Sequence, residues 1–285
     1  MDGKVVVITG GTSGIGQVAA ERLAAMGARI VLVARDRHRA AGALAAINRA
    51  GPGLAHRPFY ADLSSIAETR AVAAEIAVAE PHVDVLINNA GALFNKRTLS
   101  PDGLEMTFAV NHMAYFMLTA GLWKTLSASG PARIVNTASG AHAGATLDFD
   151  DLQSAKTYSG FAVYGRSKLC NILFTRELAR RLAGTGVTAN SLHPGFVATR
   201  FGDRSGGLFQ AVMPIAKLGA ISPQKGAETI VYLASSPEVE GVTGQYFYQC
   251  KPQPPSAAAQ DDAAAARLWT ESERLARAVA AGAEP

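Results

Sequence analysis

Three side chains in the middle of the sequence could together move a proton to or from a carbonyl oxygen. Tyr164 and Lys168 are four residues apart, a spacing that places both on one face of a helix. An ammonium group beside a phenol lowers the phenol pKa from about 10 toward neutral pH. The hydroxyl of Ser139, 25 residues before Tyr164, can polarise a carbonyl oxygen while the phenol supplies the proton. These residues predict hydride transfer to or from a carbonyl carbon.

A glycine-rich turn near the N-terminus predicts where a dinucleotide would bind. Gly10 permits a tight turn, Gly14 lets the backbone approach a pyrophosphate, and Gly16 lets the following helix lie close to the strand. The free N–H groups and the positive dipole end of that helix would face the phosphates. The residues expected to line this end of the site are Gly10, Thr12, Ser13, Gly14, Ile15 and Gly16.

The end of the second expected strand bears on the choice between NAD(H) and NADP(H). An acid there would accept hydrogen bonds from the ribose 2′-hydroxyl, whereas an arginine balances a 2′-phosphate. Ala34 occupies the usual acid position and Arg35 follows it, which favours NADP(H), while Asp36 keeps NAD(H) open as an alternative. After the third strand, Asp62 and Leu63 are expected beside the adenine, although Asp62 or Ser64 could instead cap the next helix.

Short Val- and Ile-rich runs alternate with longer segments of helical period, the pattern of a parallel sheet with crossover helices. We predict one Rossmann-type, doubly wound α/β domain with seven parallel strands and helices on both faces. Expected strands are 5–9, 29–34, 56–61, 83–88, 132–138, 187–192 and 243–248. Expected helices are 14–26, 36–50, 64–79, 102–128, 161–183 and 223–235.

Two segments stand apart from this pattern. Residues 202–218 combine Gly206 and Gly207 with an apolar helical run, which suggests a substrate lid, although an ordinary surface helix would read the same way. Residues 1–250 are expected to form the NADP-binding catalytic domain, including that lid. Residues 251–285 form a C-terminal loop and a helix over about 263–281, expected to pack on the body or on a partner subunit.

Composition narrows the class of protein. The 285 residues carry a net charge of +4, but the basic residues are spread out except for a short cluster at 35–39, which suits a small phosphorylated ligand better than nucleic acid. No apolar run is long enough to span a bilayer, and the first strand starts too early for a signal peptide. With two cysteines and no metal-binding spacing, we expect a cytoplasmic protein without a metal.

The motifs together resemble the classical short-chain dehydrogenase/reductase superfamily over residues 4 to about 250. The resemblance implies that Tyr164 is the general acid/base, that Ser139 holds the substrate oxygen, that Lys168 binds the nicotinamide ribose and tunes Tyr164, and that Asn111 supports a proton-relay water. It also implies further contacts to the cofactor, from Asn89, Ala90, Gly91, Tyr164, Lys168, Pro194, Gly195, Val197 and Thr199. Homodimers and homotetramers are both common in the superfamily.

The sequences of residues 164–182 and 186–195, with Val110-Asn111-His112, look most like the retinol dehydrogenase-like branch. This likeness implies NADP(H) and a lipophilic alcohol or carbonyl substrate. The branch also implies that the segment 140–157 forms one wall of the substrate pocket. Two other functions stay open: reduction of a carbon–carbon double bond, and a sensor that binds NADP(H) without turnover.

Several other residues have plain structural interpretations. We expect His142 to be a pocket or surface histidine rather than a catalyst, since Tyr164 already supplies the acid/base, and His193 to be a turn residue. Cys170 is expected to pack rather than react. The apolar stripe of Met113, Phe116 and Met117 suggests core packing or a subunit interface.

Overall fold

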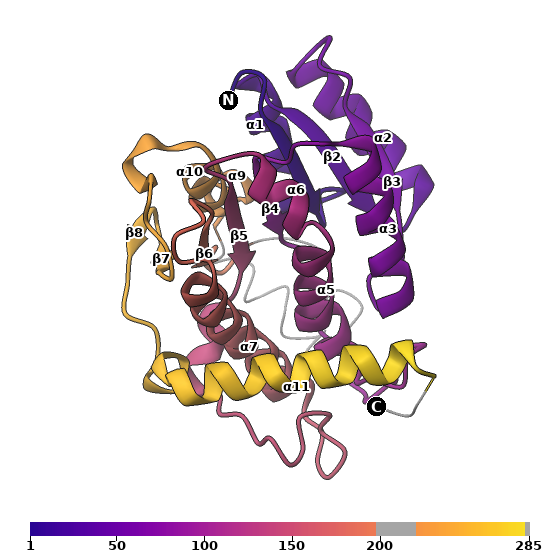
Figure 1. The fold of residues 1–285 in the computed structure, drawn as a ribbon, viewed down its shortest axis with the longest axis vertical. Helices are drawn as coiled ribbons and strands as arrows, with labels where there is room; N and C mark the ends of the chain where they lie inside the picture. Colours follow the sequence, from indigo (N-terminus) through magenta and orange to yellow (C-terminus); the bar gives the residue numbers. More distant parts are fainter. Residues whose placement is uncertain (198–220, 283–285) are drawn as a thin grey trace.

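The computed structural model describes residues 1–197 and 221–282, which fold around one mainly parallel sheet (Figure 1). The strands follow the order β3-β2-β1-β4-β5-β6-β7-β8, so the chain winds outward from β1 in one direction and from β4 in the other. Their bounds are β1 Val5–Thr9, β2 Arg29–Ala34, β3 Arg57–Tyr60, β4 Val85–Asn88, β5 Arg133–Thr137, β6 Thr188–His193, β7 Tyr246–Tyr248 and β8 Lys251–Pro252. This is the doubly wound arrangement that the sequence predicts.

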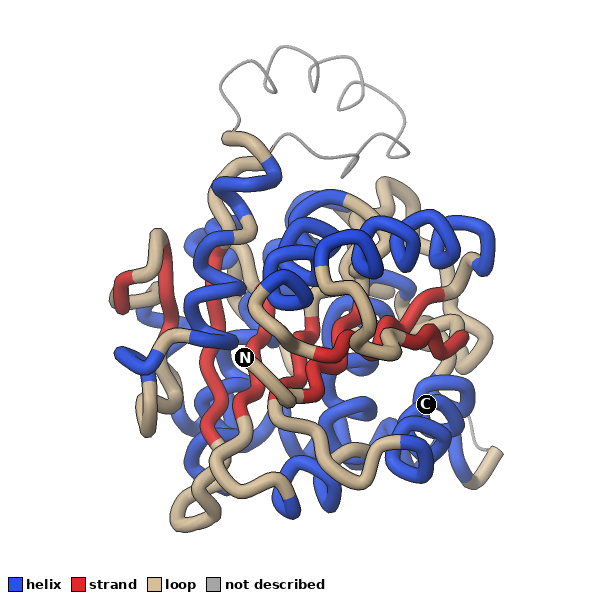
Figure 2. Tube along the Cα trace, turned by 90° about the horizontal axis from the view of Figure 1, so that it is seen from above, coloured by secondary structure: helices blue, strands red, loops and turns tan. Residues whose placement is uncertain are grey.

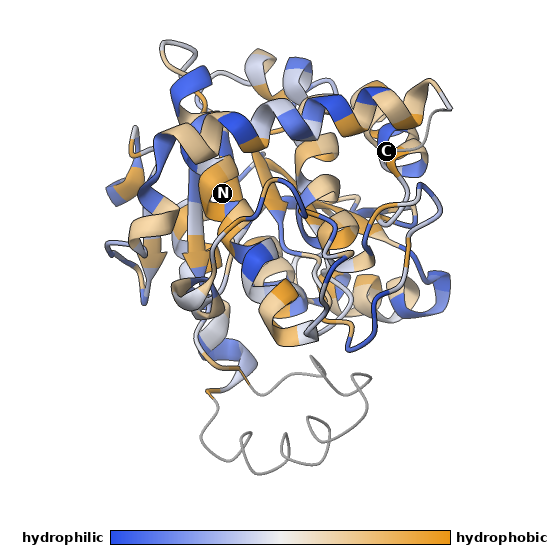
Figure 3. Cartoon of the chain, turned by 90° about the horizontal axis from the view of Figure 1, so that it is seen from below, coloured by the Kyte–Doolittle hydropathy of each residue, from blue (hydrophilic) through white to orange (hydrophobic). Residues whose placement is uncertain are grey.

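Two separate apolar cores lie on the two faces of the sheet, because side chains alternate along each strand. In β1, Val5 and Val7 belong to one core, whereas Val6 and Ile8 belong to the other. Figure 2 shows the strands between two layers of helices, and Figure 3 shows hydrophobic residues concentrated on these inner elements. Burial on both faces explains why these strands read as continuous apolar runs.

The helices divide between the two faces. Residues of α1 (Gly14–Ala25), α2 (Arg37–Ala50) and α10 (Glu228–Ser235) join one core, and those of α3 (Ile66–Ala79), α5 (Ala114–Gly121) and α7 (Gly160–Arg181) join the other. The shorter elements are α4 Met106–Phe108, η1 Ala109–Met113, α6 Trp123–Ala128, η2 Gly140–Gly144, α9 Pro223–Gly226, η4 Pro237–Val239 and η5 Ala257–Gln260.

The predicted count of seven strands is wrong, because a two-residue eighth strand pairs antiparallel with β7. The turn between them places Gln249 and Cys250 at φ of 50° and 60°. A hairpin turn of this kind normally carries Asn-Gly or Gly-Gly. Because Gln and Cys rarely adopt positive φ, the sequence did not indicate the hairpin. Pro252, which cannot donate to a ladder, is tolerated in this edge strand.

The single helix predicted over 102–128 is also wrong, since the segment forms α4, the π-helix η1, α5 and α6 in succession. Leu122, between α5 and α6, has φ −94° and ψ 3°, which interrupts the helical path. Gly121 allows the close approach there, because a Cβ on it would lie 2.5 Å from the Cβ of Ala73 in α3. Helical periodicity survives such interruptions, so the sequence pattern did not reveal them.

The C-terminal extension folds back onto the body. Its helix α11 (Asp262–Ala280) agrees closely with the predicted 263–281 and lies across α7 and α5 (Figure 1). Leu268 and Leu275 are buried in the same core as these helices. Among the described residues, every helix is too short or too polar to cross a membrane. The predicted lid, residues 202–218, lies outside the described residues.

Candidate active site

The glycine-rich turn joins β1 to α1 and has the backbone conformation that its sequence predicts. Gly10 and Gly14 have φ of +67° and +58°, in the left-handed region that favours glycine. A Cβ on Gly16 would lie 2.4 Å from both the carbonyl oxygen of Gly10 and the Nδ2 atom of Asn89. The turn is therefore a tight backbone cradle at the start of a helix, which fits a pyrophosphate.

Thr9 and Asn89 bind this turn to the end of β4. The Oγ1 atom of Thr9 accepts hydrogen bonds from the main-chain N–H groups of Asn89 (2.9 Å) and Ala90 (3.0 Å). The side-chain amide of Asn89 donates to the Thr9 carbonyl at 3.2 Å. The contacts place Asn89, Ala90 and Gly91 beside the glycine turn, at the point where the strand order reverses and α/β sheets bind ligands.

Guanidinium groups gather at the carboxyl ends of β2 and β3. Arg35 has a side chain that is 70% exposed and reaches Asp62 at 3.4 Å. Arg39 donates to Ser13 Oγ, in the glycine turn, at 3.1 Å. Arg37 lies over the ring of Tyr60, 4.0 Å from its centroid. Of these three cations, Arg39 therefore contacts the glycine turn directly.

The acidic residues near these cations have structural partners. Asp36 is the N-cap of α2 and accepts from the N–H of Arg39. Burial raises the pKa of Asp62, but hydrogen bonds from Ser64 and the charge of Arg35 outweigh it, so the pKa is lowered and the carboxylate stays charged. The N-cap of α3 is Ser65, so the expectation that Asp62 or Ser64 caps it is wrong. Leu63 is partly buried against the core.

Lys168 and Asn171, one turn apart on α7, converge on the end of β5. The Lys168 Nζ atom donates to the carbonyl oxygen of Thr137 at 3.0 Å, and the amide of Asn171 donates to the same oxygen at 3.1 Å. The ammonium also lies 5.6 Å from the ring centroids of both Tyr164 and Tyr115. Burial lowers the pKa of Lys168 to about 7.

The Tyr164 phenol lies beside Ser139, as predicted, but its pKa departs from the expected direction. Burial raises the pKa of Tyr164 to about 12, and a hydrogen bond with Ser139 lowers it only in part. Desolvation of the phenolate dominates, and the Lys168 Nζ atom is directed at the Thr137 carbonyl instead of at the phenol. The phenol is therefore protonated at neutral pH and can act as a proton donor.

Asn111 lies in the π-helix η1 and links three parts of the site. Its Oδ1 atom accepts from the N–H of Ala92 at 2.8 Å, and its Nδ2 atom donates to the Ala92 carbonyl at 3.0 Å. The same Nδ2 atom donates to Ser167 Oγ at 2.9 Å. Gly91 lies against both Lys168 and Asn111, since a Cβ on it would be 3.3 Å from Lys168 Nζ and 3.4 Å from Asn111 Oδ1. Single-turn π-helices often occur at functional sites.

The segment after β6 completes the described part of the site. Gly195 has φ of +92°, and its N–H donates to the ring of His193. Val197 and Ile15 both contact Gly226, because a Cβ on that glycine would lie 2.7 Å and 2.8 Å from their side chains. Pro194 to Val197 thus adjoin the helix that follows the glycine turn. Thr199 lies outside the described residues.

The secondary residues mostly take the structural roles that their sequence context indicates. Cys170 is buried, as are Met113, Phe116 and Met117, so the stripe belongs to the core of a single chain. His193 is the last residue of β6, so the expectation of a turn residue is wrong, and its ring stacks on Tyr248 with centroids 4.6 Å apart. His142 is buried and contacts the main chain of Ser139.

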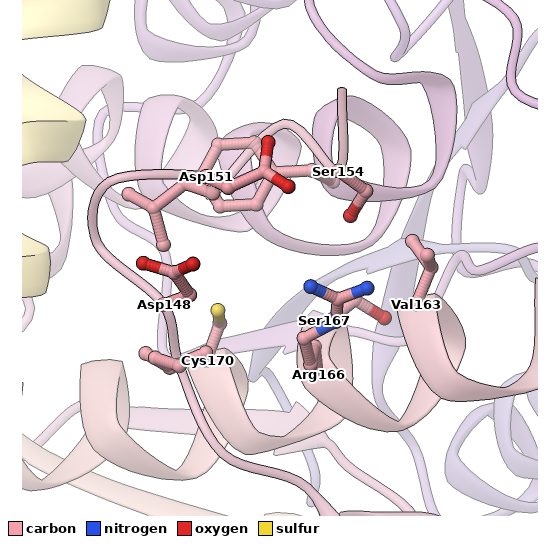
Figure 4. A pocket seen from close by; sticks show the side chains of 10 residues that line it. Asp148, Asp151, Ser154, Val163, Arg166, Ser167 and Cys170 are labelled. Carbon is pink, nitrogen blue, oxygen red and sulfur yellow. The ribbon is translucent and has the colours of Figure 1, made fainter. Parts of the chain in front are cut away.

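A small pocket lies between the segment 140–157 and α7 (Figure 4). Asp148, Asp151 and Ser154 line one side, and Arg166 and Cys170 line the other. Its volume of about 10 Å³ has room for about one water molecule. Tyr164 and Lys168 are absent from its lining. This pocket is therefore separate from the group of residues around Ser139.

The geometry matches a known family of enzymes. A sequence model for short chain dehydrogenases matches residues 4–206. The chain belongs to the short-chain dehydrogenase family. Retinol dehydrogenase 14 from Homo sapiens is 43% identical over 290 residues, which cover 96% of this chain and 86% of that protein. This short-chain dehydrogenase is therefore an oxidoreductase of the retinol dehydrogenase-like branch.

Solved structures agree with this assignment. An uncharacterized protein from Mycobacterium paratuberculosis matches with a TM-score of 0.77 and 30% identity, over 97% of this chain and 94% of that one. The RhlG/NADP active-site complex from Pseudomonas aeruginosa matches with a TM-score of 0.70 and 27% identity, over 87% of this chain and 94% of that one. The family fold implies a nicotinamide cofactor, which the glycine cradle fits.

Several residues that hold the site together escaped the sequence analysis. Thr9 acts through its hydroxyl, Thr137 through its main-chain carbonyl and Asn171 through its side-chain amide. Their spacing in the sequence does not indicate a role in the site. Arg39 belongs to the basic cluster, but only the fold shows that it reaches Ser13. Thr9 directly precedes the glycine turn, and that position was the one signal available.

Proposed function

We propose that the protein is an NADP(H)-dependent oxidoreductase that moves a hydride between the nicotinamide and a carbonyl or secondary alcohol of a lipophilic small molecule. NADP(H), when bound, supplies or accepts the hydride. The observation that carries the proposal is the grouping of Tyr164, Ser139 and Lys168 at the carboxyl end of β5. The phenol is protonated at neutral pH and can donate a proton when a carbonyl is reduced. We propose reduction as the direction because NADPH exceeds NADP+ in a reducing cell.

Each residue has a distinct part in this reaction. Ser139 would hold and polarise the substrate oxygen through its hydroxyl, and Tyr164 would donate the proton to that oxygen. In its protonated form Lys168 places a positive charge near the phenol, and Asn111 ties the loop after β4 to α7. A charge that develops on the substrate oxygen would therefore meet a hydroxyl, a phenol and an ammonium.

The arginines at the end of β2 support NADP(H) over NAD(H). Arg35 is largely exposed and Arg39 already contacts the glycine turn through Ser13, so both could approach a 2′-phosphate. Asp36 is engaged in capping α2 and is a weaker candidate for the ribose hydroxyls. The similar RhlG structure is named as an NADP complex, which agrees with this choice.

A lipophilic substrate is supported by two exposed phenylalanines and by the relatives. Phe161, one turn before Tyr164 on α7, is 57% exposed, and Phe196, after Gly195, is 51% exposed. Apolar side chains at such positions favour an apolar ligand. A similar protein is named for retinol, itself lipophilic. The proposed compartment is the cytoplasm, which agrees with two free cysteines in the described structure.

Oxidation of NADPH by the purified protein, followed at 340 nm with lipophilic ketones, aldehydes and quinones, tests the proposal. We expect NADPH to support turnover better than NADH, with an alcohol as the product of a ketone. Tyr164→Phe should lower kcat by about a thousandfold, because it removes the proton donor. It should leave the binding of NADPH within a few-fold, as measured by the cofactor's fluorescence.

Three results would contradict the proposal. A Tyr164→Phe protein that retains kcat would remove the assigned role of the phenol. A product in which a carbon–carbon double bond is reduced and the carbonyl is kept would indicate a different reaction. Tight NADPH binding with no turnover across the panel would indicate a sensor that binds NADP(H) without catalysing a reaction.

A further inference from the structure

His142 makes two contacts with the same atom of Ser139. It lies three residues later, on the 3-10 helix η2, and its side chain is buried. Its main-chain N–H donates to the Ser139 carbonyl oxygen at 3.2 Å, and its Nδ1 atom lies 2.7 Å from that oxygen. A carbonyl oxygen only accepts, so the Nδ1 atom must carry the proton.

The other ring nitrogen contacts the C-terminal extension. Because a neutral imidazole has one N–H, the Nε2 atom of His142 is an acceptor, and the main-chain N–H of Ser256 donates to it at 3.2 Å. The ring lies edge-on to Tyr246, with centroids 5.1 Å apart, and His193 is close enough to interact with it electrostatically. Burial lowers the pKa of His142 and so favours this neutral form. His142 thus connects the carbonyl of Ser139 to residue 256.

The position of η2 sets how Ser139 meets Tyr164. The Oγ atom of Ser139 accepts from the N–H of Ala141, so the serine side chain depends on the path of η2. On one side η2 packs against α7, where a Cβ on Gly165 would lie 2.7 Å from the Ala141 carbonyl oxygen. Gly165 directly follows Tyr164. His142 is bound to the start of the same turn through the Ser139 carbonyl oxygen.

We propose that His142 is a positioning residue for Ser139, and that Ser256 of the C-terminal extension holds His142 in place. The extension thereby completes the active site, although it lies beyond the residues 4–206 that the family model covers. The inference rests on the proposed function, since it assumes that Ser139 holds the substrate oxygen. A displacement of about 1 Å in such a group can cost one to two orders of magnitude in rate.

Three substitutions at residue 142 separate the two contacts. In His142→Asn the amide nitrogen takes the place of Nδ1 and can still donate to Ser139. In His142→Gln the amide oxygen can reach the place of Nε2 and accept from Ser256, but the donor to Ser139 is lost. His142→Phe removes both contacts and keeps the ring. We expect kcat to fall about tenfold in the Gln and Phe variants and to recover within about threefold in the Asn variant.

A pair of substitutions at residue 256 tests the contact with the extension. Ser256 has φ of −56°, which suits proline, but the Cδ atom of a proline would take the place of the N–H that points at His142. Ser256→Pro therefore removes the donor and displaces the His142 ring. Ser256→Ala keeps that N–H and is the matched control for the loss of the hydroxyl. We expect kcat of the Pro variant to be about tenfold below that of the Ala variant, because the displaced ring also loses its contact with Ser139, whereas His142→Asn keeps that contact. The KM for NADPH should be the same in both residue 256 variants.

The outcomes distinguish this inference from the proposed function. A wild-type protein that reduces no carbonyl in the panel overturns the proposed function and this inference with it. An active wild-type protein whose His142 variants all keep their kcat overturns the inference alone. Equal losses in the Asn, Gln and Phe variants, in parallel with their melting temperatures, would show a structural role instead of positioning.

Discussion

At the scale of single residues, Arg35 should decide how strongly the protein prefers NADPH. Its guanidinium is largely exposed and has one long contact to Asp62, so it can turn toward a 2′-phosphate. A hydrogen bond to a charged group contributes about 1.5–3 kcal/mol. We expect Arg35→Ala to raise the KM for NADPH by about ten- to a hundredfold and the KM for NADH by less than about threefold. Steady-state kinetics with both cofactors measures this.

Arg37→Ala provides the control for that substitution. It removes the same charge two residues along the chain, but the Arg37 side chain packs over Tyr60. Its effect on the KM for NADPH should be smaller than that of Arg35→Ala. Equal effects of the two substitutions would point to the general basic charge of this region, and an unchanged NADPH preference in Arg35→Ala would contradict the assignment.

The positions of the main site residues could be predicted because they depend on local geometry. Tyr164 and Lys168 share a helix face through their spacing, and Gly10 and Gly14 adopt the conformations that their turn requires. The raised pKa of Tyr164 could not be predicted, because it depends on burial by distant elements. The contacts of His142 could not be predicted for the same reason, since its partner Ser256 is 114 residues away.

At the scale of elements, Trp269 should anchor α11 to the body. Its ring is stacked on Phe174, with centroids 5.8 Å apart, and lies edge-on to Phe116 at 5.1 Å. The guanidinium of Arg181 lies 4.3 Å from the same ring. We expect Trp269→Ala to lower the free energy of unfolding by about 3 kcal/mol, the lower part of the range for such changes because the ring is only partly buried. Urea denaturation measures this.

An exposed residue of the same helix gives the reference for Trp269. Arg274 pairs with Glu271 at 2.9 Å, but its side chain is 57% exposed. A surface pair of this kind contributes little, so Arg274→Ala should cost less than about 1 kcal/mol. A Trp269→Ala protein as stable as Arg274→Ala would mean that α11 does not hold this position in solution.

The elements were easier to predict than their ends and interruptions. Continuous apolar runs mark most strands of the central sheet, and helical periodicity marks α11, so the sequence shows both directly. The hairpin to β8 and the break at Leu122 depend on backbone angles that their residue types do not indicate. The π-helix that carries Asn111 keeps an apolar, helix-like sequence, so it too was hidden.

At the scale of the whole molecule, several histidines fold in their neutral form. Burial lowers the pKa of His112 to about 3 and that of His193 to about 4, with a smaller contribution from His142 in the second case. Burial also lowers the pKa of His142 and of His56. The unfolded chain binds protons at these sites at a higher pH than the folded chain does. The fold should therefore lose stability as the pH falls below about 6.5.

His112 should make the largest single contribution to this loss. Its Nε2 atom lies 2.8 Å from Ser272 Oγ in α11, and the Ser272 hydroxyl donates to the Leu268 carbonyl. Nε2 is therefore the donor to Ser272. With a pKa of about 3 in the fold and about 6.5 when unfolded, His112 keeps its full stabilising effect above pH 6.5 and loses it progressively down to pH 3. Between pH 7 and pH 5 the loss is about 2 kcal/mol.

His112→Gln should remove this pH dependence while keeping a donor for Ser272. Denaturation at a series of pH values gives the free energy of unfolding at each pH. Between pH 7 and pH 5 this free energy should fall by about 2 kcal/mol less in the variant than in the wild type. Some pH dependence remains in the variant, because His193, His142 and His56 still titrate. His82→Gln, at an exposed position, is the control for replacing a histidine by glutamine outside the core. If His112→Gln keeps the wild-type pH dependence, the buried ring does not determine how acid destabilises the protein, and protonation of other groups must account for the loss.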